Sequence, residues 1–195
     1  MNGVIKSVCV YCGSRTGNDP SYANIAKQIG SSLAENNFKV VFGAGSIGMM
    51  GIVACSALSA GGKVIGVIPE HLDDIEITLP GLTELYVTKN MHDRKALMFD
   101  KSDAFVLLPG GLGSLDEFFE ILTWAQLGLH SNPIIIFNQK DYWRPLLTLI
   151  NHIIEENFSG IECKALYQVA DTTEAVIDIL KSSKCDITPA KPELF

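Results

Sequence analysis

Short apolar runs alternate with longer amphipathic stretches along this chain, and that alternation limits the folds it can adopt. The runs are rich in β-branched residues and apolar on both faces, which is typical of strands buried inside a parallel sheet. They predict strands at residues 7–11, 39–42, 63–68, 84–88, 104–108 and 133–137. Helices are predicted at residues 21–36, 48–60, 91–101, 114–127, 142–157 and 173–181. The sequence therefore predicts an α/β fold with a doubly wound parallel sheet flanked by helices.

The length and composition of the chain fit a single domain. With 195 residues, of which 47% are hydrophobic and 19% charged, it is long enough to bury one sizeable core and too apolar to stay disordered. We expect one domain over residues 1–185, followed by a proline-containing tail over residues 186–195.

The formal net charge of −7 limits which partners the chain attracts. An acidic protein gains no general attraction to nucleic-acid phosphates or to anionic lipid, so we expect neither nucleic acid nor a membrane as a partner. The first residues lack a signal-peptide pattern, and no apolar run reaches the about 18 residues of a membrane span. We therefore expect a cytoplasmic protein whose partners are small molecules.

Five cysteines are scattered along the chain, an odd number that argues against a disulfide framework. Cys9 and Cys12 form a C-x-x-C pattern at the end of a predicted strand, without a second Cys or His pair at zinc spacing. We expect buried structural thiols, and redox or metal chemistry stays the alternative. The sequence predicts no metal site.

Glycines gather directly after two predicted strands. One group lies in residues 43–51, after the strand at 39–42, and the other lies in residues 109–114, after the strand at 104–108. Ligands bind at the carboxyl edge of an open parallel sheet, because helix N-termini there present free N–H groups to anions. Glycines let the backbone approach phosphate oxygens closely. The sequence therefore predicts a phosphate-bearing ligand at this edge.

The first glycine group has two further interpretations. Residues 43–48 match G-x-G-x-x-G between a strand and a helix, and Glu70 follows the next strand, which together form a dinucleotide fingerprint. The pattern is short, however, and it lies in the second strand-to-helix turn instead of the first. Small residues that let a helix pack closely on a strand would leave the same pattern, so a purely structural interpretation also stays open.

The second glycine group has a structural alternative as well. Ser114 and Glu117 fit an S-x-x-E capping box, which would explain both residues as helix-start signals. Upstream, Arg94 and Lys95 stand at the start of the helix predicted before the strand at 104–108, and that helix begins at the same edge of the sheet. A cationic cluster that faces the glycine loop in an acidic protein favours anion binding.

Three segments carry motifs that occur together in one family. Residues 91–95 read M-H-D-R-K, residues 109–117 read P-G-G-L-G-S-L-D-E, and residues 122–128 read L-T-W-A-Q-L-G. They resemble the Lonely Guy (LOG) family of cytokinin-activating phosphoribohydrolases, with its M-x-x-R-K and P-G-G-x-G-T-x-x-E motifs, and the likeness extends to residues 10–14 and 43–51. The resemblance implies a Rossmann-like α/β fold, usually as a homodimer. It also implies hydrolysis of the N-glycosidic bond of N6-modified adenosine 5′-monophosphates to the free base and ribose 5-phosphate.

The resemblance further implies roles for individual residues. Glu117 matches the catalytic glutamate, which would stabilise an oxocarbenium-like transition state and activate water, and Arg94 matches the catalytic arginine. The remaining matched positions would bind the nucleoside 5′-monophosphate substrate: Ser14, Gly45, Glu76, Lys95, Gly110, Gly111, Gly113, Ser114 and Thr123. Amides at the helix start near Ser114 would hold the 5′-phosphate.

The chain departs from the family pattern at two positions. Ser114 replaces a threonine and keeps its hydroxyl group, and Ala44 replaces a glycine, which adds one carbon to that loop. We expect neither change to abolish activity. Many relatives carry the label lysine decarboxylase, but no lysine stands out as a Schiff-base candidate, so neither pyridoxal phosphate nor another cofactor is predicted.

Two other functions stay open on these residues. One is a general nucleosidase that acts on plain AMP, because the shape of a pocket for the N6 group cannot be read from a sequence. The other is a carrier of a nucleotide or of molybdenum cofactor that uses the same fold without hydrolysis. Phosphate binding alone needs no acid beside the ligand, so the pair of Arg94 and Glu117 argues against a carrier.

Overall fold

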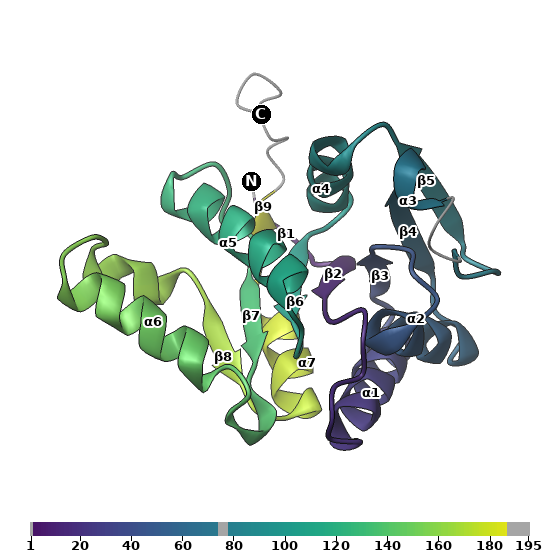
Figure 1. The fold of residues 1–195 in the computed structure, drawn as a ribbon, viewed down its shortest axis with the longest axis horizontal. Coiled ribbons are helices and arrows are strands. Elements are labelled where there is room, and N and C mark those ends of the chain that lie inside the picture. The colour runs from purple at the N-terminus through teal and green to yellow at the C-terminus, as the bar shows by residue number, and fades with distance from the viewer. Residues whose placement is uncertain (1, 74–77, 187–195) are drawn as a thin grey trace.

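The computed structural model describes residues 2–73 and 78–186 and contains one large parallel sheet (Figure 1). Its seven strands lie in the order β5-β4-β3-β2-β6-β7-β8, and every neighbouring pair is parallel. These strands are β2 Ser7–Tyr11, β3 Lys39–Phe42, β4 Val64–Pro69, β5 Glu84–Thr88, β6 Ala104–Leu107, β7 Ile134–Phe137 and β8 Gln168–Ala170. A separate antiparallel ladder pairs β1 (Asn2–Gly3) with β9 (Cys185–Asp186).

Helices connect the strands and cover both faces of the sheet. They are α1 Ser21–Glu35, α2 Gly48–Ser59, α3 Glu70–Asp73, α4 Met91–Asp100, α5 Leu112–Gln126, α6 Arg144–Glu155 and α7 Thr173–Ser182, with 3-10 turns at Gln139–Asp141 and Ile161–Ala165. No helix in this part of the chain is long and apolar enough to cross a membrane.

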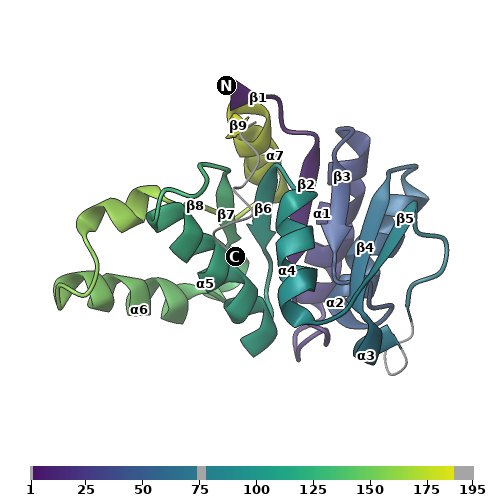
Figure 2. The same ribbon diagram turned by 90° about the horizontal axis from the view of Figure 1, so that it is seen from above.

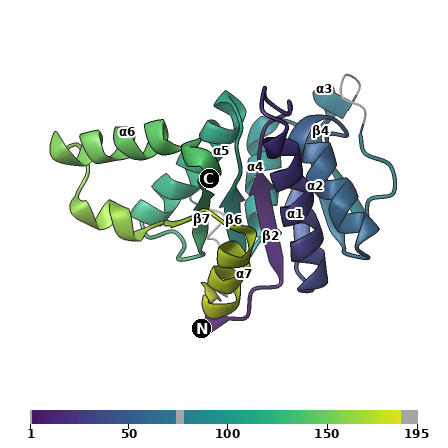
Figure 3. The ribbon, with the colours of Figure 1, turned by 90° about the horizontal axis from the view of Figure 1, so that it is seen from below.

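Side chains alternate between two cores, one on each face of the sheet. On β2, Val8 and Val10 point into the core under α1, α2 and α7, while Cys9 and Tyr11 point into the core under α4, α5 and α6. Figure 2 shows the layer of α4 and α5 in front, and Figure 3 shows the layer of α1, α2 and α7 in front. All of β2 is buried, as a parallel strand covered on both faces has to be.

The order of the strands reverses next to β2. β3 lies on one side of β2 and β6 on the other, so the chain winds outward in two directions from this central pair. The connections that leave the carboxyl ends of β2 and β6 diverge, which opens a crevice at the ends marked by Tyr11 and Leu107. In doubly wound sheets this switch point is where ligands bind.

The doubly wound α/β fold predicted from the sequence is confirmed. The predicted strands and helices all form, with small shifts at their ends. β8 was not predicted, because its three residues are too few and too exposed to give an apolar run; β1, β9 and the short α3 gave no pattern either. The helix predicted from residue 142 begins only at Arg144, because its N-cap Trp143 has φ and ψ angles of −89° and 9°, outside the α-helical range. The predicted tail lies outside the described residues from position 187 onward, and the domain boundaries stay a prediction.

α1 and α2 approach each other closely at Gly30. A Cβ at this position would collide with the carbonyl oxygen of Val53 and would lie 3.1 Å from the Ser56 Cβ. Glycine inside a helix costs about 1 kcal/mol relative to alanine, so its presence in α1 needs a reason. The close approach of the two helices supplies that reason.

We expect Gly30→Ala to destabilise the protein by about 1–3 kcal/mol, because the clash with Val53 outweighs the gain in helix propensity. Gln28→Ala, at an exposed position on the same helix, should change the free energy of unfolding by less than about 0.5 kcal/mol. Urea unfolding followed by circular dichroism measures both variants. A Gly30→Ala variant more stable than the wild type would mean that α1 and α2 lie farther apart.

Candidate active site

Helix α5 begins without a side-chain cap. Its N-cap is Gly111, and its first backbone hydrogen bond runs from the Leu115 amide to the Gly111 carbonyl over 3.1 Å. Ser114 is buried inside the first turn and is not the N-cap, so the capping-box interpretation of Ser114 and Glu117 is wrong. Within the described residues, the amides of residues 112–114 meet no backbone acceptor and no capping side chain. The positive end of α5 is therefore open to an anion.

Two glycines of this loop have no structural need to be glycine. A Cβ added to Gly111 or Gly113 would meet nothing within 4 Å, and neither residue has a left-handed φ angle. Gly110 differs, because a Cβ there would collide with the Ser114 hydroxyl group. The atoms of residues 2–73 and 78–186 thus leave the space beside Gly111 and Gly113 free, as a loop that admits a ligand against its backbone requires.

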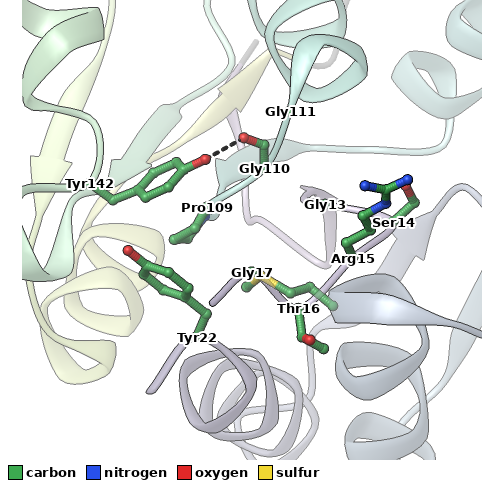
Figure 4. Close-up of a pocket in the computed structure, with 11 residues that line it drawn as sticks. Gly13, Ser14, Arg15, Thr16, Gly17, Tyr22, Pro109, Gly110, Gly111 and Tyr142 are labelled. Atoms are coloured by element: carbon green, nitrogen blue, oxygen red, sulfur yellow. Dashed lines mark hydrogen bonds between the residues drawn. The ribbon is translucent and has the colours of Figure 1, made fainter. Parts of the chain in front are cut away.

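A cavity of about 240 Å³ opens beside this loop at the switch point of the sheet (Figure 4). Residues 13–17 after β2 and residues 109–111 after β6 form two of its walls, and Tyr22, Met49 and Tyr142 complete it. A backbone hydrogen bond of 3.1 Å joins the two wall segments. The cavity therefore lies where the fold class binds its ligands.

Arg94 is buried in the first turn of α4, and backbone carbonyl groups fix its guanidinium. Nε donates to the Val67 carbonyl and Nη2 donates to the Gly43 carbonyl, each over 3.1 Å. Gly43 has to be glycine, because a Cβ there would collide with the guanidinium. Since Arg94 is only 7% exposed, a positive charge lies beneath the carboxyl ends of β3 and β4.

Glu117 lies on α5, near enough to Arg94 for the two charges to interact. Burial raises the pKa of its carboxyl group to about 7, although the positive charge of Arg94 lowers that pKa; the negative charge of Asp116 raises it further. No ion pair joins Arg94 directly to Glu117 among the described residues, so the arginine acts on the carboxyl group through space. The Glu117 side chain stays partly exposed, and its pKa near neutrality suits a general acid or base.

Lys95 joins α4 to α5. Its Nζ lies 3.0 Å from Glu120 Oε1 and 3.2 Å from Asp116 Oδ2. Burial acts against its charge, but hydrogen bonds to Glu120 and Asp116 raise the pKa of Lys95 above its usual value. The side chain thus fixes the two helices that carry Arg94 and Glu117. Its contact with a nucleotide stays a prediction.

The loop over residues 43–51 packs against the chain itself. Gly48 has a φ angle of +62°, and a Cβ there would collide with the backbone of Ser14. Ala44 is buried with a φ angle of 63°, a left-handed conformation in which glycine is favoured. Gly45 is buried and pairs in an isolated β-bridge. Packing within the chain accounts for these small residues, which supports the structural interpretation over a dinucleotide fingerprint.

The remaining predicted substrate-binding residues lie apart from one another. Ser14 lines the cavity. Thr123 is exposed on α5, on the helix stripe of Asp116 and Glu120 and turned away from Glu117. Glu76 lies outside the described residues.

The cysteines of the C-x-x-C pattern are structural. Cys9 and Cys12 are buried in opposite cores, and burial raises the pKa of both thiols far above the usual value. Because the thiolate is the reactive form, these thiols are inert, and the prediction of buried structural thiols is confirmed. Among residues 2–73 and 78–186, no group of three or more His, Cys, Asp or Glu side chains is arranged to hold a metal ion.

Similarity to known proteins identifies the family. A family described as "Possible lysine decarboxylase" matches residues 50–180. A cytokinin riboside 5′-monophosphate phosphoribohydrolase of Rhodococcoides fascians is 43% identical over 178 residues, which cover 91% of this chain and 90% of that protein. One of Arabidopsis thaliana is 44% identical over 176 residues, which cover 90% of this chain and 83% of that protein. The chain belongs to the Lonely Guy family.

Solved structures place the Lonely Guy fold among others of the same architecture. The molybdenum cofactor binding protein of Rippkaea orientalis matches with a TM-score of 0.68 over 91% of this chain and 96% of that chain, at 21% sequence identity. The Moco carrier protein of Chlamydomonas reinhardtii matches with a TM-score of 0.66 over 90% of this chain and 95% of that chain, at 19% sequence identity. At these identities the likeness shows a shared Rossmann-like fold and nothing about shared ligands.

The cavity of this Lonely Guy protein also contains residues that the sequence did not indicate. Arg15 and Thr16 directly follow the matched residue Ser14, and a cation next to a predicted ligand edge is a signal that could have found Arg15. Tyr22 and Tyr142 gave no such signal, because aromatic residues near helix starts most often belong to the core.

Replacing Glu117 by glutamine should stabilise this Lonely Guy protein at alkaline pH. Folding raises the pKa of Glu117 from 4.5 to about 7, so the unfolded chain loses this proton first and stability falls as the pH rises through that interval. Glu117→Gln removes this loss. Its melting temperature should exceed that of the wild type at pH 8 and approach it at pH 4, as measured by differential scanning calorimetry.

Glu174→Gln is the matched control. Glu174 lies in the first turn of α7, where the N-cap Thr172 accepts a hydrogen bond from the Ala175 amide over 3.1 Å. A carboxylate at a helix start stabilises through the helix dipole, so this variant should lose about 0.3–1 kcal/mol at pH 8. If Glu117→Gln also lowered the free energy of unfolding at pH 8, the carboxylate of Glu117 would be stabilising its helix, as that of Glu174 does.

Proposed function

We propose that this protein hydrolyses the N-glycosidic bond of N6-modified adenosine 5′-monophosphates and releases the free base and ribose 5-phosphate. The observation that carries the proposal is the carboxyl group of Glu117, with a pKa of about 7, on the helix whose open N-terminus borders a glycine-lined cavity. The relatives that are 43% and 44% identical and are named cytokinin riboside 5′-monophosphate phosphoribohydrolase support the same reaction.

The open start of α5 and the adjoining cavity would bind the 5′-phosphate. The amides of residues 112–114, which meet no acceptor among the described residues, would direct the positive end of the helix at an anion, and Arg15 on the opposite wall would add a positive charge. The cavity of about 240 Å³ is smaller than the roughly 300–1,000 Å³ of a site for a drug-sized ligand. It therefore fits the phosphate and ribose, while the base extends beyond it.

The reaction breaks the bond between ribose C1′ and the base nitrogen N9 and forms a bond between C1′ and a water oxygen. The electron pair of the broken bond leaves with the base, which gains one proton, and the water loses one. The carboxylate of Glu117 would stabilise the positive charge that develops on the ribose and accept the proton of the water. A pKa of about 7 gives this group access to both its ionised and its protonated form near neutral pH.

Arg94 would keep Glu117 ionised during the reaction. Its charge lowers the pKa of Glu117, and the Val67 and Gly43 carbonyls hold the guanidinium in place when substrate enters. Nη1 also donates to the Met91 sulfur over 3.7 Å, and the N–H groups that then remain would be left for ribose or phosphate oxygens. A lysine ammonium group lacks the planar set of donors that lets a guanidinium bind the two carbonyls and a substrate oxygen at once.

We also propose that the protein acts as a cytoplasmic homodimer without nucleic-acid or membrane partners. Leu112 and Leu127, near the two ends of α5, are 86% and 67% exposed, and exposed apolar side chains at a helix surface support contact with a second copy. The net charge of −7 supports the absence of polyanionic partners.

Incubation of the purified protein with isopentenyl-AMP and with AMP should release free base, faster from the modified nucleotide, as followed by chromatography. Glu117→Ala and Arg94→Lys should each lower kcat by about 10²-fold or more, because each removes part of the acid–base machinery. Glu174→Gln serves as the control with unchanged kcat. Release of no base by folded wild-type protein would contradict hydrolysis and favour a nucleotide carrier, and equal turnover of both nucleotides would indicate a general AMP nucleosidase.

Gly111→Ala should weaken substrate binding and cost the fold only the preference of an N-cap for glycine over alanine. Its Cβ would enter only the space beside the loop, so the free energy of unfolding should fall by no more than about 1 kcal/mol while KM rises about tenfold. Gly110→Ala is the contrasting variant, because its Cβ would collide with Ser114 and should lower stability itself. Thermal unfolding and initial-rate kinetics separate the two effects; an unchanged KM in Gly111→Ala would place the phosphate elsewhere.

A further inference from the structure

The turn between β7 and α6 adopts an unfavourable backbone conformation. Lys140 and Asp141 are consecutive non-glycine residues with φ angles of 56° and 57°. Each left-handed residue of this kind costs about 1–2 kcal/mol. Such conformations persist only where the surrounding structure fixes them, and they cluster at functional sites.

Three side-chain hydrogen bonds hold this turn. Asn138 Oδ1 accepts from the Trp143 amide over 2.7 Å, and Asn138 Nδ2 donates to Asp141 Oδ1 over 3.2 Å. Lys140 Nζ lies 2.8 Å from Asp19 Oδ2, on the loop that follows β2, and this hydrogen bond lowers the pKa of Asp19 to about 2. The turn is therefore tied both to itself and, through Asp19, to the loop whose residues 13–17 form one wall of the cavity.

The residue that the turn delivers to the cavity is Tyr142. Its hydroxyl group donates to the Gly110 carbonyl over 2.6 Å, and Figure 4 shows the phenol ring reaching across to the glycine loop. The ring packs edge-on against Tyr22, with centroids 5.3 Å apart, and against Trp143 at 4.8 Å. The rings fix the position of the phenol, and the hydroxyl group makes its polar contact with the loop.

This hydrogen bond fixes the peptide that leads into α5. A trans peptide directs its C=O and N–H groups to opposite sides, so a fixed Gly110 carbonyl also fixes the direction of the Gly111 amide. The preceding peptide is held in the same way, because the Pro109 carbonyl accepts from the Gly13 amide over 3.1 Å. The Gly110 carbonyl is also the acceptor that the Ser114 amide would use if α5 began one residue earlier.

We infer that Tyr142 is a positioning residue for the phosphate group of the substrate: its hydroxyl group holds the Gly110–Gly111 peptide so that the amides at the start of α5 stay directed at the anion. The inference rests on the proposed function for the identity of the substrate. Tyr142 acts through the loop and does not take part in breaking the glycosidic bond.

The test is Tyr142→Phe, which removes the hydroxyl group and keeps the ring. We expect KM for isopentenyl-AMP and the inhibition constant of ribose 5-phosphate to rise about three- to tenfold, the range for one lost hydrogen bond, with kcat changed less than about twofold. Inhibition by free adenine, which carries no phosphate, should stay the same. Tyr86→Phe is the matched control, because its hydroxyl group also donates over 2.6 Å, to Glu84 on the edge strand β5.

A second variant and a direct binding measurement complete the test. Lys140→Gly keeps Tyr142 but removes the ion pair to Asp19, and it should weaken ribose 5-phosphate binding by a smaller factor. Titration of the 15N-labelled protein with inorganic phosphate should shift the Gly111 amide resonance in the wild type and much less in Tyr142→Phe. This titration reports on the loop even if the wild type hydrolyses no nucleotide, in which case the proposed function fails and the positioning role stands.

Unchanged ribose 5-phosphate inhibition in Tyr142→Phe and Lys140→Gly would overturn the inference while leaving hydrolysis intact. A fall in kcat with KM unchanged would overturn it as well, because it would place Tyr142 in the chemical step. Should Tyr142→Phe unfold at assay temperature, the titration with inorganic phosphate is made below its melting temperature, where a Gly111 shift equal to that of the wild type contradicts the role and a smaller shift supports it.

Discussion

The uncapped start of α5 is the constraint on which the rest of the site depends. The first amides of any helix lack intrahelical acceptors, and most helices satisfy one of them with a Ser, Thr, Asp or Asn side chain at the N-cap, worth about 1 kcal/mol. α5 has Gly111 at that position, and Ser114, the serine that follows along the chain, lies inside the first turn. No side chain of Gly111 or Gly113 covers the first amides of α5, so the space beside these two residues is open among the described residues. An anion is the acceptor that such a helix end lacks.

The second constraint is the balance of charge around Glu117. Burial raises the pKa of this carboxyl group and the buried charge of Arg94 lowers it, with a net pKa of about 7. That effect depends on the spacing of α4 and α5, which Lys95 fixes through its two carboxylate partners. Those partners, Asp116 and Glu120, themselves raise the pKa of Glu117 while Lys95 lowers it. The pKa of Glu117 therefore depends on how α4 and α5 pack against each other.

The sequence predicted the fold more completely than the site, and the reason is the range of the interactions involved. Buried strands and amphipathic helices leave local patterns, so the doubly wound sheet could be predicted, whereas the three residues of β8 left none. The S-x-x-E pattern could not distinguish a capping box from a ligand loop, because only the helix start at Leu112 decides between them. Arg94 could be picked out by motif, but its carbonyl partners lie 27 and 51 residues away along the chain. Contacts of that range appear only when the strands have been placed side by side.

Carrier proteins share this fold, so the fold does not separate a hydrolase from a carrier. The residue that can separate them is Glu117 on α5. An ionised Glu117, less than two turns from the N-terminus of its helix, would repel a phosphate dianion bound there and weaken its binding. A protein that only carried a phosphate-bearing ligand would bind it better with an amide or an apolar residue at this position. The bound dianion would in turn raise the pKa of Glu117, and the charge of Arg94 opposes that rise. A site with both the Glu117 carboxylate and a bound phosphate would lose affinity for the phosphate, and the buried carboxylate lowers the stability of the fold. Hydrolysis of the glycosidic bond is the function that would require a carboxylate beside the phosphate.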